Sequence, residues 1–160
     1  LIKIPKFDKS KDDRSNKKYW QKIKKKPNII IFEGWCVGAK PQFNKDLIEP
    51  INILEKKYDN KLTWRKKVNN ELKTNYKKVF DLIDKKIYLK VPSFKYVLKW
   101  RLLQEKKLKF KTKSKTMNDR EVKRFIMFYE RITKGMLKNY KSNDIVVKID
   151  NKHKIHSINY

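Results

Sequence analysis

The feature that most constrains the fold is a short run in which every position is apolar, Ile29-Ile-Ile-Phe32. β-Branched and aromatic side chains favour strands, and a strand without polar positions is typical of one buried on both faces of a sheet. Strands of this kind occur mainly in parallel sheets that are covered by helices. The run, which Asn28 precedes, therefore predicts an α/β fold.

The rest of the chain alternates apolar patterns of helix and strand type. Asn118 and Glu121 have the spacing of a capping box, which marks the start of a helix. The order strand, helix, strand, helix, helix, strand predicts a parallel sheet with right-handed crossovers. The helices are expected over 62–83, 94–108 and 118–139, and the strands over 28–32, 86–91 and 144–149.

The remaining segments are more polar. Residues 3–26 are expected to form a loop with a short helix, residues 36–62 a loop with a helical piece near 51–57, and residues 151–160 a polar tail. A length of 160 residues fits one domain. A chain of that size can bury a substantial core.

The chain is strongly basic, with a net charge of +27. Only six of its 44 basic residues are arginine, and lysine, isoleucine, asparagine and tyrosine, which are all common here, have AT-rich codons. We therefore interpret much of the charge as solvated surface. A basic nucleic-acid-binding module stays open as an alternative, because such a charge attracts polyanions at low salt. The lysines are, however, spread along the whole chain, and no nucleic-acid-binding motif occurs.

Other features bear on the compartment. Cys36 is the single cysteine, which excludes a disulfide framework and fits a reducing, cytoplasmic compartment. No apolar stretch has the length of a membrane span, and no secretory leader opens the chain. The first residue is Leu1, which suggests a fragment or a processed chain.

Glu33 is the first candidate site residue. It follows the apolar run directly, and Gly34 beside it permits a tight turn or the close approach of a ligand. In open α/β sheets ligands bind at the carboxyl ends of the strands, and burying an unpaired carboxylate is costly. Glu33 could therefore serve a magnesium or phosphate site, although a carboxylate that points into solvent fits the pattern equally well.

The segment Phe7–Arg14 is the second candidate. It combines acids, a serine hydroxyl and basic groups within eight residues. Arg14 could bind a carboxylate or phosphate with two hydrogen bonds, and Asp8 or Asp12 could accept a hydroxyl proton. The alternative interpretation is an exposed turn.

Arg101 is the third candidate. It lies on a predicted helix that precedes a basic linker, so that it could reach a transferring phosphate from a closing lid. Alternatively, Arg101 and Glu105 form an ordinary ion pair at i,i+4 spacing.

Several other motifs fail on inspection. Gly34 and Gly38 are separated by three residues, whereas a phosphate loop has four between its glycines and a Lys-Ser/Thr pair directly after the second. Cys36 has no histidine near it in sequence and is expected to be unreactive. His153 and His156 have no acid or cysteine nearby that would complete a metal site.

Four strings of the sequence together resemble one family, the D-glycerate 3-kinases. The Phe-Glu-Gly-Trp-Cys and Trp-Arg-x-x-Gln-Glu parts are specific, and Pro92-Ser-Phe94, Met117 and residues 125–133 add support. The resemblance covers about residues 1–150. The strings are Pro5-Lys-Phe-Asp-Lys-Ser10 with Asp12-Asp13-Arg14, Phe32-Glu-Gly-Trp-Cys-Val-Gly-Ala-Lys-Pro41, Pro50-Ile-Asn-Ile-Leu-Glu55 and Trp100-Arg-Leu-Leu-Gln-Glu105.

The resemblance implies a phosphate-loop kinase fold of the uridine kinase and phosphoribulokinase group. Residues 1–150 would be the C-terminal part of a single kinase domain, with a lid at about 93–117. The implied reaction transfers the γ-phosphate of ATP, with Mg²⁺, to the 3-hydroxyl of D-glycerate. A kinase-like protein of this fold with another acceptor, or with no activity, is the alternative. The implied partner is a small-molecule substrate, with no membrane and no specific nucleic acid.

The resemblance also implies roles for particular residues. The family's phosphate loop has no counterpart in this sequence, so we expect the 160 residues alone to show no glycerate kinase activity. Glu33 falls on an acid that helps to order magnesium and Arg101 on the lid arginine, while Asp8, Lys9, Ser10, Arg14 and Trp35 are assigned to substrate binding.

Overall fold

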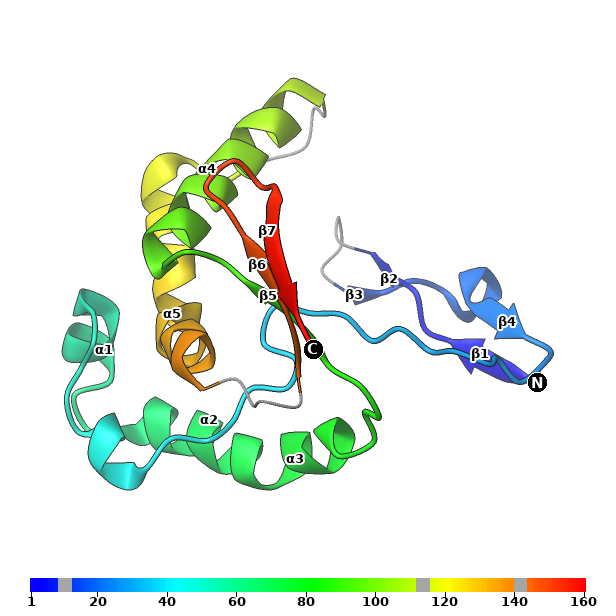
Figure 1. The fold of residues 1–160 in the computed structure, drawn as a ribbon, viewed down its shortest axis with the longest axis horizontal. Coiled ribbons are helices and arrows are strands. Elements are labelled where there is room, and N and C mark those ends of the chain that lie inside the picture. Colours follow the sequence, from blue (N-terminus) through cyan, green and yellow to red (C-terminus); the bar gives the residue numbers. More distant parts are fainter. Residues whose placement is uncertain (9–12, 112–115, 140–143) are drawn as a thin grey trace. The chain divides into compact units, whose positions relative to one another are not determined.

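The computed structural model describes residues 1–8, 13–111, 116–139 and 144–160. The chain divides into two compact units, Leu1–Gly34 and Trp35–Tyr160, where the length had suggested a single domain (Figure 1). The boundary falls between the Glu33-Gly34 pair and Trp35, in the middle of the most specific string of the sequence.

The first unit consists of two small antiparallel ladders. Strand β1 (Ile2–Ile4) pairs with β4 (Gln21–Ile23), and β2 (Phe7–Asp8) pairs with β3 (Asp13–Arg14). The expected short helix near Tyr19 is the 3₁₀ helix η1 (Lys17–Tyr19), whose first turn is capped by the Asn16 side chain. All three residues of β1 are exposed, so this unit has little core of its own.

The strand predicted over residues 28–32 does not form. These residues have no regular secondary structure, and the side chains of Ile29, Ile30 and Ile31 are 79%, 80% and 84% exposed. A strand buried on both faces needs a partner strand at its edges and a packed layer on each face. No strand of the described residues pairs with this segment, which is why its strong β propensity has no effect on its conformation.

The second unit contains a three-stranded sheet of order β5-β6-β7. Strands β5 (Ile87–Lys90) and β6 (Ile145–Ile149) lie where the sequence predicted them and are parallel. Residues 151–160, expected only as a polar tail, provide β7 (Ile155–Asn159), which is antiparallel to β6. The sheet is therefore mixed, because the turn at Asp150–Lys154 folds the chain back. The α/β class is confirmed.

The helices of the second unit lie close to their predicted positions, with one exception. The predicted helix 62–83 is interrupted at Thr74, whose hydroxyl donates to the carbonyl of Asn70 at 3.0 Å and whose φ and ψ are −115° and −85°. This side chain competes with the helical hydrogen bonds of the backbone. The helices are η2 (Asn44–Leu47), α1 (Ile53–Tyr58), α2 (Thr63–Lys73), α3 (Asn75–Phe80), α4 (Phe94–Lys111) and α5 (Asp119–Lys138).

Helix α5 is the centre of the second unit. The predicted capping box is present, because the Asn118 side chain accepts from the Glu121 amide at 2.9 Å and the Glu121 side chain accepts from the Asn118 amide at 2.8 Å. Val122 and Ile126 form its buried face, and α5 packs against both α4 and α1 (Figure 1). Among the described helices none is long and apolar enough to cross a membrane.

Candidate functional site

Arg101 lies on α4 and is largely buried, with 22% of its side chain exposed. Its Nη2 is 2.6 Å from Oε1 of Glu105, and its Nη1 donates to Oε1 of Gln104 at 2.6 Å. The ion pair that the sequence offered as an alternative is thus present, but it is not a loose surface pair. No described residue accepts a hydrogen bond from the buried Nε of Arg101, which leaves that donor available to another group.

Glu105 binds the chain just before α5 as well as the Arg101 side chain. Its Oε2 accepts a hydrogen bond at 3.0 Å from the amide of Met117, immediately before α5 begins, and the residue is only 8% exposed. One carboxylate therefore fixes the guanidinium on α4 and the chain that enters α5. Charge-assisted hydrogen bonds of this type are stronger than neutral ones, so the position of Arg101 relative to α5 is well determined.

An aromatic row joins Arg101 to Trp35. The Arg101 guanidinium lies 5.4 Å from the ring centroid of Phe125, and Phe125 lies 5.1 Å from Tyr129, one turn further along α5. Tyr129 stacks on Trp35 with a centroid distance of 4.9 Å and an interplanar angle of 14°. Two predicted site residues that are 66 positions apart in the sequence are therefore brought to the two ends of one contiguous row.

We call Trp35, Tyr129, Phe125 and Arg101 the aromatic row. Its chemistry is that of a binding and charge-stabilising surface: a partly exposed indole at one end and a guanidinium at the other. A guanidinium favours oxyanions such as phosphate and carboxylate, and aromatic faces favour planar or apolar groups. The row contains no group that would act as a general base near neutral pH.

Phe125 and Tyr129 were not among the predicted site residues. The periodicity predicted the helix on which they lie, but no motif indicated that their rings would connect Trp35 to Arg101. Their i,i+4 spacing was a usable signal, because such a pair shares one face of a helix. What could not be read from the sequence is that Trp35, 94 positions before Tyr129 in this numbering, packs on that face.

The other predicted site residues belong to the first unit. Glu33 is exposed and lies in the segment without regular structure, not at the end of a strand. Asp8 faces Asp13, and Phe7 faces Arg14, across the β2–β3 ladder, so that the two described ends of the predicted acceptor segment are paired antiparallel. Lys9 and Ser10 lie outside the described residues. The structure therefore connects Arg101 and Trp35 through two rings within the second unit. For the predicted site residues of the first unit, it defines only the contacts within that unit.

The described residues do not form a complete magnesium site by themselves. Among the described residues no three His, Cys, Asp or Glu side chains cluster in a way that could hold a metal ion. Mg²⁺ is commonly bound by one or two carboxylates together with substrate phosphates and water. Glu33 offers a single exposed carboxylate, and the sequence has no phosphate loop to place phosphates beside it.

Cys36 follows Trp35 in a turn and is partly buried. Burial raises the pKa of the Cys36 thiol, so that less of the reactive thiolate forms at neutral pH. The turn is closed by Gly38, whose φ of 77° lies in the left-handed region that favours glycine. The raised pKa of the Cys36 thiol favours the prediction that this thiol is unreactive.

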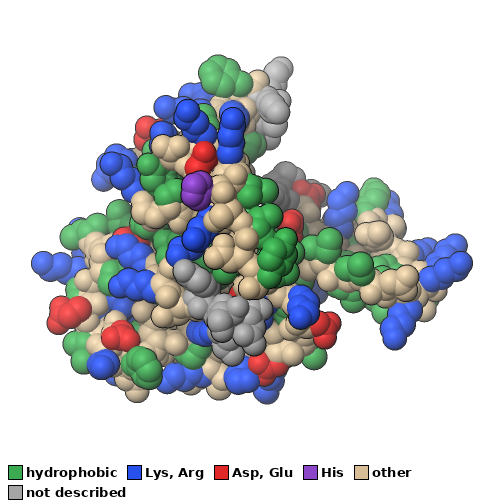
Figure 2. Space-filling model, viewed as in Figure 1, with side chains coloured by type: hydrophobic (Ala, Val, Ile, Leu, Met, Phe, Trp, Pro, Cys, Tyr) green, Lys and Arg blue, Asp and Glu red, His purple; other side chains and the backbone are tan. Residues whose placement is uncertain are grey.

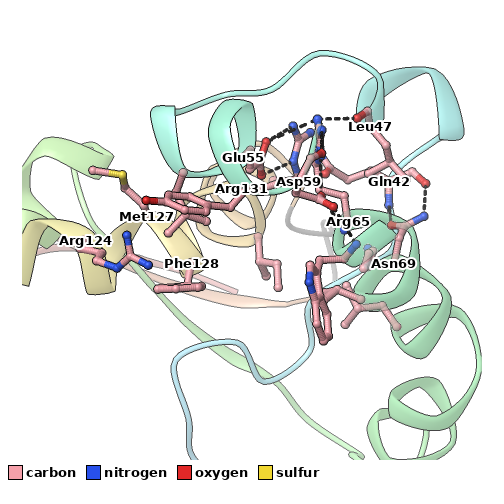
Figure 3. A pocket seen from close by; sticks show the side chains of 18 residues that line it. Gln42, Leu47, Glu55, Asp59, Arg65, Asn69, Arg124, Met127, Phe128 and Arg131 are labelled. Carbon is pink, nitrogen blue, oxygen red and sulfur yellow. Dashed lines mark hydrogen bonds and ion pairs between the residues drawn. The ribbon is translucent and has the colours of Figure 1, made fainter. Parts of the chain in front are cut away.

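A buried ionic network, which was not predicted from the sequence, joins α1, α2 and α5 (Figure 3). Arg131 forms two hydrogen bonds to the Glu55 carboxylate, Nε to Oε1 at 2.8 Å and Nη2 to Oε2 at 2.7 Å. Arg65 pairs with Asp59 through Nε and Oδ2 at 2.9 Å. All four residues are at most 8% exposed, so the network is part of the core.

The network lowers the pKa of both acids. Burial alone would raise the pKa of Glu55, but the hydrogen bond and charge of Arg131, the Ile51 amide and the charge of Arg65 outweigh it and hold that pKa low. Burial is likewise outweighed at Asp59, whose pKa is lowered by the amides of Trp64 and Arg65 and by the Arg65 guanidinium. Both carboxylates are therefore ionised partners of the arginines at neutral pH.

No protein-family model matches the chain, but two curated proteins are similar to it over most of its length. It is 34% identical over 134 residues to the uncharacterized kinase mug58 of Schizosaccharomyces pombe, a region that covers 80% of this chain and 47% of that protein. It is 29% identical over 132 residues to the chloroplastic D-glycerate 3-kinase of Arabidopsis thaliana, covering 80% of this chain and 26% of that protein.

The fold is also similar to a solved structure. A D-glycerate 3-kinase from Cryptococcus neoformans superposes with a TM-score of 0.78 at 24% identity, covering 98% of this chain and 59% of that one. This likeness confirms the predicted kinase type of fold. The chain spans about half the length of the first curated relative and a smaller share of the second.

Proposed function

We propose that the chain, which is similar to these kinases over most of its length, is a member of the D-glycerate 3-kinase family and the C-terminal part of an ATP-dependent glycerate kinase. The proposed reaction moves the γ-phosphate of ATP to the 3-hydroxyl of D-glycerate. The family's motifs reach from Pro5 to residue 133, and the similarity to a named D-glycerate 3-kinase extends over 132 residues.

The observation that carries the proposal is the aromatic row. Arg101 and Trp35 were assigned to the site from two separate motifs, and they occupy the two ends of one continuous surface. A charged residue fixed by Glu105 and resting on an aromatic ring is suited to act on an anionic substrate, because its position costs little to maintain during the reaction.

The proposed roles follow from this arrangement. Arg101 stabilises negative charge on the phosphoryl group in transfer, and Trp35 forms a wall of the substrate site. Asp8, Lys9, Ser10 and Arg14 bind the acceptor, with Arg14 holding the glycerate carboxylate. These first-unit assignments rest on motif position alone. The single Cys36 supports a reducing, cytoplasmic compartment.

ATP and Mg²⁺ are part of the proposal, and when bound they supply the phosphoryl group and neutralise its charge. Glu33 is the residue we propose to contact the magnesium ion. Because the described residues offer neither a metal cluster nor a phosphate loop, we propose that the groups that hold the phosphates lie outside these 160 residues.

Two alternatives remain distinct from this proposal. A protein of the same fold with another acceptor would keep Arg101 and Trp35 but bind D-glycerate poorly. A nucleic-acid-binding module would need a continuous basic face, whereas Figure 2 shows basic side chains scattered among acidic and neutral ones on the face in view. The face in view therefore gives no support to a nucleic-acid-binding surface.

The test is a coupled kinase assay with D-glycerate and Mg-ATP on two proteins, the 160-residue chain and a longer chain that carries an upstream phosphate-loop segment. We expect activity and ATP binding only in the longer protein. Micromolar ATP affinity of the 160 residues, measured by calorimetry, would contradict the proposed division of the site, and a longer protein inactive on D-glycerate would contradict the acceptor.

Within the longer protein, Arg101→Ala should lower kcat about 100-fold or more and leave ATP affinity within a few-fold, because a group that acts on developing charge contributes mainly to the transition state. Arg120→Ala, which removes an exposed arginine from α5, is the matched control and should leave both constants unchanged. An Arg101→Ala protein with normal kcat and normal circular dichroism would reduce Arg101 to a structural ion pair.

A further inference from the structure

A second site is suggested by a pocket of about 490 Å³ in the second unit. It is open on one side and is lined mainly by residues of α1, α2 and α5 (Figure 3). Pockets that bind small molecules usually measure about 300 to 1,000 Å³ and are mainly apolar with a few convergent polar groups. Neither Trp35 nor Arg101 lines this pocket, nor does any other residue predicted for phosphoryl transfer.

The wall of the pocket is apolar, and its rim is aromatic. Trp64, Phe128 and Tyr58 line it although they are 62%, 59% and 58% exposed. Because more than half of each of these aromatic side chains is exposed to water, burying them would give a substantial hydrophobic stabilisation. Three of them around one hollow form a surface that gains free energy when an apolar group covers it.

The charges of the pocket are not balanced. Its two acids, Glu55 and Asp59, are already neutralised by Arg131 and Arg65 in the buried network. Two other cations line the hollow, Lys40 and Arg124, and neither forms an ion pair with any described residue. The pocket therefore presents an uncompensated positive charge beside an apolar cavity.

Arg124 is placed at the aromatic end of the pocket. Its guanidinium lies 5.1 Å from the Tyr58 centroid and 6.0 Å from the Phe128 centroid, and Figure 3 shows it beside Phe128, away from the Gln42–Asn69 pair. Stacking on rings orients a guanidinium while leaving its N–H donors free for an oxyanion. No hydrogen bond to another described residue uses these donors, which makes Arg124 the natural anchor for an acid group.

The frame of the pocket is held rigidly. The buried network fixes three helices to one another, and Asn69 clamps Gln42 with two hydrogen bonds: it accepts from the Gln42 amide at 2.7 Å and donates to the Gln42 carbonyl at 3.1 Å. A cavity formed in advance loses less conformational entropy when it binds a ligand.

From these observations we propose that the pocket binds an amphipathic organic anion. An aliphatic chain or aromatic ring fills the apolar hollow, and a carboxylate or phosphate group contacts Arg124. A second copy of this chain is a poor occupant, because a net charge of +27 on each copy would oppose association. The site is independent of the proposed kinase function, and its failure would leave that proposal unaffected.

The test is a titration of the 160-residue chain with octanoate, an anion that has an eight-carbon tail, followed by NMR of the Trp64 indole N–H. A Trp64→Phe protein assigns that signal. Octanol keeps the tail without the charge, and acetate keeps the charge without the tail. We expect octanoate to shift the Trp64 signal saturably and to bind about tenfold or more tightly than either control.

Two variants of α5 locate the anion. Arg124→Gln should weaken octanoate about tenfold and leave octanol unchanged, whereas Arg120→Gln, one helical turn away and outside the pocket, should leave both unchanged. Val68→Glu, which places an acid in the partly exposed wall, should abolish octanoate binding. Equal binding of octanoate and acetate, an equal loss in Arg120→Gln, or an unmoved Trp64 signal would each overturn the proposal.

Discussion

Residues 29–32 and strand β6 are close in composition and opposite in environment. Both are β-branched or aromatic at nearly every position, and each is followed by an acid, Glu33 or Asp150. In β6, Val146 and Val147 are 4% and 7% exposed, whereas Ile30 and Ile31 are 80% and 84% exposed. Strand β6 is the middle strand of a sheet, whereas residues 29–32 have no regular secondary structure.

The difference between the two runs lies in their neighbours. Strand β6 has β5 on one side and β7 on the other, so that its backbone donors and acceptors are paired across both edges. Residues 29–32 have no partner strand among the described residues. β Propensity expresses how well a side chain fits a pleated and packed surface. Where no such surface is available, propensity alone does not produce a strand.

The sharpest test of this comparison is hydrogen exchange of the 160-residue chain. Amides of residues 29–32 should exchange close to the rate of an unstructured peptide, while those of Val146 and Val147 should be slower by about 10³-fold or more, because core strands open only with most of the fold. Mass spectrometry or NMR measures both in one sample. Similar protection of the two runs would contradict the comparison, and new protection of 29–32 in a longer chain would show that a partner strand had been supplied.

An aspartate introduced into each run should change the free energy of unfolding by very different amounts. Val146→Asp would bury an unpaired carboxylate and should lower the free energy of unfolding by about 4 kcal/mol or leave the second unit unfolded. Ile30→Asp, at a position that is 80% exposed, should change it by less than about 0.5 kcal/mol. Urea unfolding followed by circular dichroism measures both. A costly Ile30→Asp would mean that residues 29–32 are packed in solution.

The pH dependence of stability should originate in the second unit. Because Glu55 and Asp59 have lowered pKa values when folded, their contribution is complete above the ordinary carboxylate range, about pH 4 to 5, and is lost as the pH falls through their folded pKa values. Urea midpoints at a series of pH values measure the loss. Glu55→Gln should flatten this dependence, whereas Glu33→Gln, at an exposed position of the first unit, should not.

The smallest contrast concerns two asparagine caps. Asn118 completes a capping box on the 20-residue α5, so Asn118→Ala should cost about 1 kcal/mol of unfolding free energy. Asn16 caps the three-residue η1 in the first unit, where its side chain accepts from the Lys18 amide at 3.1 Å. Asn16→Ala should leave the urea midpoint unchanged, and equal costs would show that the first unit unfolds together with the second.

The sequence predicted those elements whose signal is local. Helix α5 and its capping box, helix α4 and strands β5 and β6 lie where the periodicity placed them. Strand β7 was missed because its pattern is short and polar, and it is defined by the turn before it. There, the Asp150 side chain accepts from the amides of Lys152 and Lys154, both at 2.8 Å, and His153 adopts a φ of 65°.

The sequence indicated the two residues at the ends of the aromatic row, but not the two rings that connect them. The motifs indicated Trp35 and Arg101, but the rings between them depend on how α4, α5 and residue 35 pack. The scarcity of arginine in the sequence was a further signal for structurally important positions. In a chain in which lysine greatly outnumbers arginine, four of the six arginines have roles that require a planar guanidinium: Arg65 and Arg131 in the network, and Arg101 and Arg124 on aromatic rings.

The two arginines of the network have a consequence for mutational tolerance. Arg131 donates to the backbone carbonyls of Asp46 and Glu49, each at 2.6 Å, and Arg65 donates to that of Leu47 at 3.0 Å. Every amino acid carries such a carbonyl, so the side chains of residues 46 and 49, which are exposed, can change without loss of these bonds. Neither arginine has that freedom, since a lysine cannot span several acceptors in one plane. The backbone of residues 46–49 is therefore fixed by the two arginines, although these hydrogen bonds do not depend on which side chains residues 46 and 49 carry.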